Sequence, residues 1–226
     1  MIETQRAADR FVTRAEGRTT HHSFSFGAHY DPANVGFALL AAHNDEELPP
    51  GTGYPDHAHV DVEIVTVVLS GALRHTSTVG NGVLGPGQVQ RLSAGSGVLH
   101  SEMADATGPT RCVQSWVVPS ETGRRPTYAS APSAARPGLV PLAGGDAPIG
   151  IGAEVRLLLG TLAAGSALVL PDVPCLHLFV TEGVLRIDEV LLGPADAARI
   201  SDQGGRTLDA VRDCTCLVWA MGVFRP

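Results

Sequence analysis

The chain has 226 residues, of which 44% are hydrophobic, and its formal net charge is −7. This length and composition allow a packed core and exclude a disordered chain. Only 16 residues are Lys or Arg and they form no basic run, so the sequence gives no electrostatic basis for direct binding to nucleic acid.

The N-terminal residues lack the apolar core of a signal peptide, and no run of about eighteen apolar residues predicts a membrane span. We therefore expect a soluble, cytoplasmic protein with no membrane partner. The four cysteines show neither the CxxC spacing of zinc sites nor the density of a disulfide framework. We expect buried or half-buried thiols at Cys112, Cys175, Cys214 and Cys216.

Glycine and proline divide the chain into short apolar segments, a pattern typical of an all-β protein. No run of twelve or more residues has a clear helical period, and the short segment LGPADAARIS (192–201) comes nearest to one. The segments predicted to form strands are EIVTVVL (63–69), QSWVV (114–118), VRLLLGTL (155–162), SALVLP (166–171), CLHLFVT (175–181) and CLVWAM (216–221).

Residues 121–152 are rich in Pro, Ala, Gly and Ser and are predicted to connect two β units. Residues 181–200 repeat the order of strand, glycine turn, strand and Gly-Pro turn found in residues 69–92, where the hairpin turn is placed at VGNG (79–82). A tandem duplication of one β-barrel module is the simplest explanation. We divide the chain into an N-terminal unit (1–125), a linker (126–150) and a C-terminal unit (151–226).

Two histidine-containing pairs in the N-terminal unit have the spacing of metal ligands. His57 and His59 lie two residues apart in DHAHVDVEIVTVVLSG (56–71), and His100 and Glu102 repeat that spacing in RLSAGSGVLHSEM (91–103). Residues i and i+2 of an extended strand point to the same side. If both strands point these residues into one barrel, three imidazoles and a carboxylate surround one point. Such donors suit Fe(II), Mn(II), Co(II) or Ni(II), with open positions for water, oxygen or substrate.

A second glutamate, Glu63, competes with Glu102 for the role of carboxylate ligand. If residues 57 to 63 form a straight strand, Glu63 lies roughly 13 Å beyond His59, too far to share an ion with it unless the chain bends. Glu102 is therefore the preferred ligand, and Glu63 is expected to support the site from outside the ligand set or to be structural.

The remaining histidines have no partner at ligand spacing. Those of the N-terminal unit are expected to be surface or hydrogen-bonded residues: His21, His22, His29, His43 and His75. His177 is the sole histidine of the C-terminal unit, and one imidazole cannot form such a site. The C-terminal unit is therefore predicted to be free of metal.

The run from Pro55 to Glu102 resembles the signature region of the pirins, which are two-cupin proteins, and residues 51–63 resemble the first cupin motif. The resemblance covers about residues 18 to 120. It implies two tandem cupin (jelly-roll) barrels, with a metal held in the N-terminal one by His57, His59, His100 and Glu102. That metal is usually iron, so Fe(II) is the first choice, with Mn, Ni, Co, Cu or Zn as alternatives. The basic residue that follows the second ligand in many pirins is absent here.

The resemblance implies two functions of different classes, because some pirins have quercetin 2,3-dioxygenase activity and the animal member is a nuclear transcriptional cofactor. The first is a metal-dependent oxidoreductase that opens a small aromatic, flavonol-like substrate such as quercetin with O2, with Glu102 as catalytic base. The second is a non-enzymatic metal- or redox-sensing module that regulates a protein partner. Both share the fold and the ligands, and we favour the enzyme.

Overall fold

A computed structural model describes residues 1–133 and 136–222. The described chain is nearly all β, with one short 3-10 helix, η1 (Ala7–Asp9). It forms two compact units. The N-terminal unit contains Phe11–Ser133 and Ile149–Ala153, and the C-terminal unit contains residues 1–10, 136–148 and 154–222 of the described chain.

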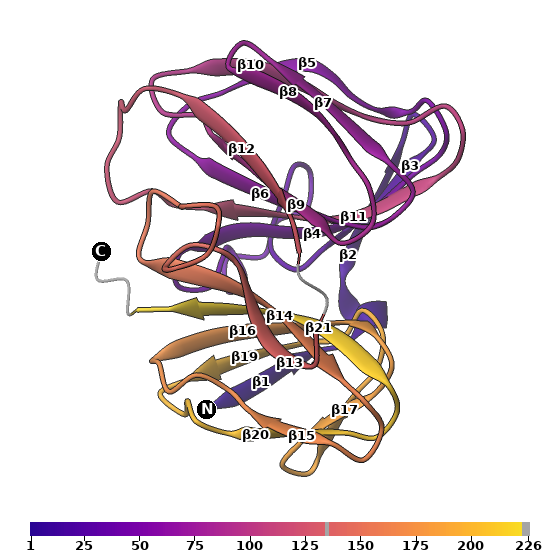
Figure 1. Cartoon of the computed structure of the whole chain (residues 1–226), viewed down its shortest axis with the longest axis vertical. Coiled ribbons are helices and arrows are strands. Elements are labelled where there is room, and N and C mark those ends of the chain that lie inside the picture. The colour runs from indigo at the N-terminus through magenta and orange to yellow at the C-terminus, as the bar shows by residue number, and fades with distance from the viewer. Residues whose placement is uncertain (134–135, 223–226) are drawn as a thin grey trace. The chain divides into compact units, whose positions relative to one another are not determined.

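The N-terminal unit consists of a seven-stranded and a four-stranded antiparallel sheet, which face each other in Figure 1. In spatial order the larger sheet contains β12 (Thr127–Pro132), β9 (Gln88–Ser93), β6 (Glu63–Ser70), β11 (Thr110–Val117), β4 (Leu40–Leu48), β3 (Arg18–His22) and β2 (Phe11–Ala15). The smaller sheet contains β5 (Gly53–His59), β10 (Val98–Ala104), β7 (Leu73–Ser77) and β8 (Gly80–Leu84).

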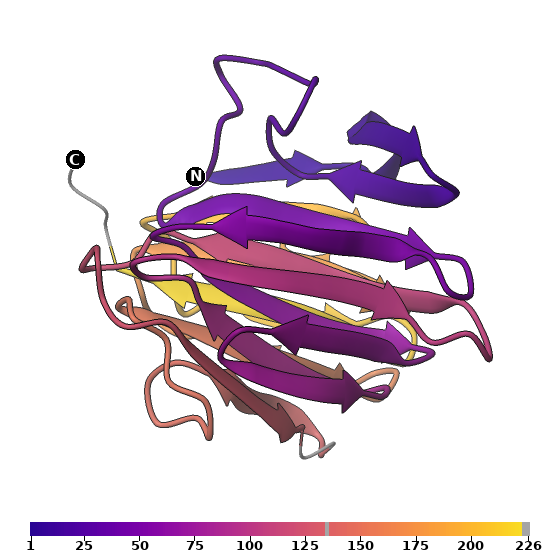
Figure 2. The same cartoon turned by 90° about the horizontal axis from the view of Figure 1, so that it is seen from above.

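Figure 2 shows the alternating directions of the purple and magenta strands of the N-terminal unit. The C-terminal unit has a six-stranded and a four-stranded antiparallel sheet, drawn mostly in orange and yellow in Figure 1. The first contains β1 (Ile2–Gln5), β19 (Ala197–Ser201), β16 (Cys175–Glu182), β21 (Cys214–Met221), β14 (Val155–Leu162) and β13 (Gly138–Ala143). The second contains β15 (Ala167–Val169), β20 (Thr207–Ala210), β17 (Leu185–Ile187) and β18 (Val190–Leu192). One continuous apolar cluster fills its core.

No helix in the described residues is long and apolar enough to cross a bilayer.

The all-β prediction is confirmed, and each of the six predicted apolar segments overlaps a strand, although only three residues of SALVLP, Ala167–Val169, form one. The strands are β6, β11, β14, β15, β16 and β21. The segment LGPADAARIS, the nearest to a helical period in the sequence, forms no helix. Its last five residues form β19, which pairs with both β1 and β16, so inter-strand hydrogen bonds override the local pattern. The four cysteines are free thiols, three of them buried and Cys175 half-buried, as predicted.

The segment expected to be a linker supplies two strands. β12 pairs with β9 in the N-terminal unit, and β13 pairs with β14 in the C-terminal unit. β12 lies at the edge of its sheet and ends at Pro132, a position where the missing N–H costs no ladder hydrogen bond. The composition of the segment therefore predicted a linker, whereas part of the segment forms the edge strand β12 of the large sheet.

The hairpin turn between β7 and β8 lies at residues 78–79 and not at 79–82 as the glycines predicted. Gly80 and Gly82 belong to β8, where they make room for the ring of Tyr128. A Cβ atom at Gly80 would lie 2.7 Å from Cδ1 of that ring. These glycines allow a close approach and are not turn residues.

The middle of β4 is unusually polar for a buried strand. Glu46 is 2% exposed, and its Oε2 accepts hydrogen bonds from Thr20 Oγ1 at 2.6 Å and Tyr54 Oη at 2.7 Å. Burial raises the pKa of this carboxyl from 4.5 to about 7, against the opposing effect of the two hydrogen bonds. The folded protein therefore binds a proton at Glu46 more tightly than the unfolded chain does.

We predict that Glu46 makes the fold less stable as the pH rises from about 4.5 to about 7, because its stabilising contribution is complete below the lower value and lost above the higher one. Glu46→Gln keeps the acceptor oxygen and removes the charge. Denaturant unfolding at pH 8 should show the variant to be more stable by up to about 3 kcal/mol, with no difference near pH 4. Glu47→Gln, at the exposed neighbouring position, serves as the control. Parallel pH profiles for wild type and Glu46→Gln would contradict this assignment.

Candidate metal centre

Strand β10 is the centre of the site because it pairs with β5 on one side and β7 on the other. On the β5 side His100 lies opposite His57, and the next paired residue, Glu102, lies opposite Tyr54, with a register shift between them. On the β7 side Glu102 lies opposite His75. Three adjacent strands therefore place potential metal ligands within one part of the small sheet.

The rings of His57, His59 and His100 form a compact triad. Their centroids are 4.3 Å (His57–His100), 4.8 Å (His57–His59) and 5.0 Å (His59–His100) apart. A metal–nitrogen bond of about 2.1 Å plus about 1.1 Å to the ring centre gives a separation of about 4.5 Å between the centres of two rings bound at right angles. One ligand nitrogen from each ring lies within 4.8 Å of the other two. The triad therefore fits a single divalent ion.

The orientation and protonation of the rings also suit a metal. His57 Nδ1 donates to the Pro55 carbonyl at 2.8 Å, which leaves Nε2 as the ligand atom. Neither nitrogen of the buried His100 has a hydrogen-bond partner. Burial lowers the pKa of His59 to about 4 and of His100 to about 3, with the nearby His57 adding to both effects. Both are therefore neutral at pH 7, the form that binds metals.

The candidate ligands belong to a polar layer between two apolar clusters. Along β6, Thr66 lies between Ile64 of one cluster and Val68 of the other. Strand β10 repeats this order, since Val98 belongs to the first cluster and Ala104 to the second. The period of two along each strand thus delivers polar side chains to one level of the core.

Glu102 is held in this layer by two glutamine side chains of the large sheet. Gln90 Nε2 donates to its Oε1 and Gln114 Nε2 to its Oε2, both at 2.6 Å. The opposite ends of the amides are fixed as well, because Tyr128 Oη donates to Gln90 Oε1 at 3.1 Å and Trp116 Nε1 donates to Gln114 Oε1 at 3.0 Å. Burial raises the pKa of Glu102 to about 7, although these hydrogen bonds favour the ionised form.

The structure brings together three of the four predicted ligands, the histidines. The fourth, Glu102, lies beside His75, which the sequence did not predict as a ligand. Glu102 groups with His100 and His75, whose ligand atoms also lie within 4.8 Å of one another. His75 is 1% exposed and neither of its nitrogens has a hydrogen-bond partner, so its assignment as a surface or hydrogen-bonded histidine is wrong. It was missed because it has no ligand-spaced neighbour in its own strand.

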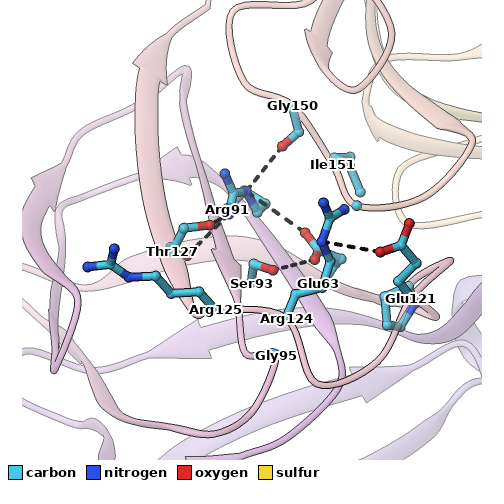
Figure 3. Close-up of a pocket in the computed structure, with 12 residues that line it drawn as sticks. Glu63, Arg91, Ser93, Gly95, Glu121, Arg124, Arg125, Thr127, Gly150 and Ile151 are labelled. Carbon is cyan, nitrogen blue, oxygen red and sulfur yellow. Dashed lines mark hydrogen bonds and ion pairs between the residues drawn. The ribbon is translucent and has the colours of Figure 1, made fainter.

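Glu63 lies in a different place, a cavity of about 350 Å³ within the N-terminal unit (Figure 3). Its Oε1 accepts a hydrogen bond from Ser93 Oγ at 2.5 Å, and its Oε2 lies 3.9 Å from Arg91 Nε. A Cβ atom at Gly152 would lie 2.8 Å from Oε1, so the carboxylate packs against the backbone of that segment. Neither group of metal-competent side chains found among the described residues includes Glu63.

Other histidines have ordinary partners. His22 bonds to Thr13 and to Asn44, both at 2.9 Å, and His43 Nδ1 lies 2.9 Å from Ser115 Oγ. His29 lies 3.2 Å from Thr13. For these three residues the prediction of hydrogen-bonded histidines is confirmed.

Known proteins resemble the chain in both sequence and fold. The family described as Pirin matches residues 4–117. A Mycobacterium tuberculosis protein, named provisionally as a quercetin 2,3-dioxygenase, is 44% identical over 97% of this chain and 95% of its own length. A pirin-like protein of Caulobacter vibrioides is 38% identical over 85% of this chain and 87% of its own.

Among solved structures, the bacterial pirin YhhW of Escherichia coli in complex with nickel(II) is 26% identical and has a TM-score of 0.94 over 99% of this chain and 100% of that one. The family match, the identity to relatives along almost the whole chain and this structural agreement lead to one conclusion. The chain belongs to the pirin family.

Proposed function

We propose that the protein is a metal-dependent dioxygenase of the pirin type that opens a flavonol such as quercetin with O2. The observation that carries the proposal is the triad of imidazoles, His57, His59 and His100, spaced for one divalent ion beside a buried carboxylate. Relatives named as quercetin 2,3-dioxygenases support the reaction and the small-molecule substrate. Iron(II) is our first choice of metal, and the nickel complex of a related pirin supports a site that accepts other divalent ions.

The three imidazoles would hold the ion, with Glu102 as the fourth ligand. When bound, a divalent ion supplies Lewis acidity, which lowers the pKa of a coordinated hydroxyl. Glu102 would accept the substrate proton at a carboxylate oxygen. Gln90 and Gln114 fix the position of that carboxylate, and the two apolar clusters flank the polar layer. The four free thiols agree with a reducing compartment, and we place the protein in the cytoplasm.

The first prediction concerns metal content. Wild-type protein should bind close to one divalent transition metal per chain, measured by elemental analysis after dialysis. His100→Ala should lose it, because His100 belongs to both groups of metal-competent side chains. His177→Ala, a buried histidine of the C-terminal unit, should keep full metal content. Full retention by His100→Ala would show that the ion binds elsewhere.

The second prediction separates the two glutamates by oxygen consumption with a panel of flavonols. Glu102→Gln keeps an oxygen donor but removes the charge, so turnover should fall by about 10²-fold or more. Glu63→Gln should stay within a few-fold of wild type, because Glu63 contacts Ser93 and Arg91 in a separate cavity. The reverse order of activities would assign the base to Glu63. No oxygen uptake by metal-loaded wild type with any flavonol would favour the sensing module.

A further inference from the structure

His75 is a buried imidazole whose polar atoms are unused. One face of its ring stacks on Tyr128, with centroids 4.4 Å apart and an interplanar angle of 11°. Its ring centroid lies 5.4 Å from that of His100. A buried polar atom without a hydrogen bond costs free energy, so two such atoms on one ring call for a partner.

Sheet register places His75 on the opposite side of β10 from the other two histidine ligands. β5 carries His57 and His59 along one edge of β10, and β7 carries His75 along the other edge, directly opposite Glu102. The candidate ligands of the small sheet therefore form two sets that meet on β10. The outer set is His57, His59 and His100, and the inner set is His75, His100 and Glu102.

The two sets differ in exposure and share His100, while Glu102 of the inner set is also the proposed fourth ligand of the outer position. All three inner residues are buried, whereas His57 and His59 are half-buried. A neutral imidazole carries a proton on one nitrogen and a lone pair on the other, so it binds one metal ion at a time. His100 can therefore serve only one of the two sets at any moment.

We propose that the inner set is a second position for a divalent transition metal, and that one ion can occupy either the outer or the inner position. The inference rests on the proposed metal centre and adds His75 to it as a ligand. Two imidazoles and a carboxylate suit the borderline ions Zn(II), Co(II) and Ni(II). An ion at the inner position is enclosed by buried side chains, whereas the outer position faces the half-buried His57 and His59. The inner position would retain the ion, and the outer one would present it to substrate.

The test is Co(II) binding, measured by equilibrium dialysis and by visible absorption of the bound ion. The double variant His57→Asn, His59→Asn removes two of the three outer ligands. It should still bind one Co(II) per chain, with an affinity weaker than wild type by about 10²-fold or more and a changed absorption spectrum. Adding His75→Phe, whose ring can keep the stacking on Tyr128, should abolish this remaining binding.

Two further variants in the double background complete the design. His43→Asn replaces another buried histidine, one that bonds to Ser115, and should leave the remaining cobalt in place. If the His75→Phe protein does not fold by circular dichroism, His75→Leu in the same background removes the same two ring nitrogens and should also abolish the remaining binding.

Each result decides between the proposals. If wild type binds no Co(II), the metal centre itself is wrong and the inner position is wrong with it. If wild type binds but the folded double variant does not, the outer centre stands and the inner position is refuted. Equal binding before and after the change at His75 would likewise refute it, because the ion would then lie elsewhere.

Discussion

The antiparallel pairing of β10 with β5 and β7 is the constraint on which the site depends. A shift of one residue in either pairing would turn His100 and Glu102 away from the core, since side chains alternate along a strand. The apolar neighbours of β10 resist such a shift, because Val98 and Ala104 are anchored in separate clusters. The same packing that stabilises the small sheet therefore sets the positions of the candidate ligands.

A buried polar layer is stable only when its hydrogen bonds are made, and in this layer most of them are. Both carboxylate oxygens of Glu102 have an amide donor, and both amides are held from behind by Tyr128 and Trp116. The imidazole nitrogens of His75 and His100 are the exception. Imidazoles left without hydrogen bonds in an otherwise satisfied network are available as ligands, which gives the layer a role besides packing.

The sequence predicted those features of the fold and of the site that depend on residues near one another along a single strand. The significance of the spacing of His57 with His59, and of His100 with Glu102, follows directly from the period of two along a strand, and the six apolar segments follow from the glycine and proline residues that separate them. His75 could not be found in this way, because its significance comes from the register between β7 and β10. Tyr128 was missed for a related reason, since it lies in a segment whose composition suggested a linker but which forms the edge strand β12.

The site is built from two sheets, and this division suggests how pirins can diverge in function. The candidate ligands come from the small sheet, whereas Gln90 and Gln114, which hold Glu102, come from the large one. The proton affinity of a buried carboxylate depends on such donors as much as on burial. A substitution at either glutamine would change the acid–base behaviour of Glu102 without altering any metal ligand. Two pirins with the same four ligands could therefore differ in chemistry. An enzyme and a metal-sensing module could share all four ligand positions and differ in the residues of the large sheet that hold Glu102.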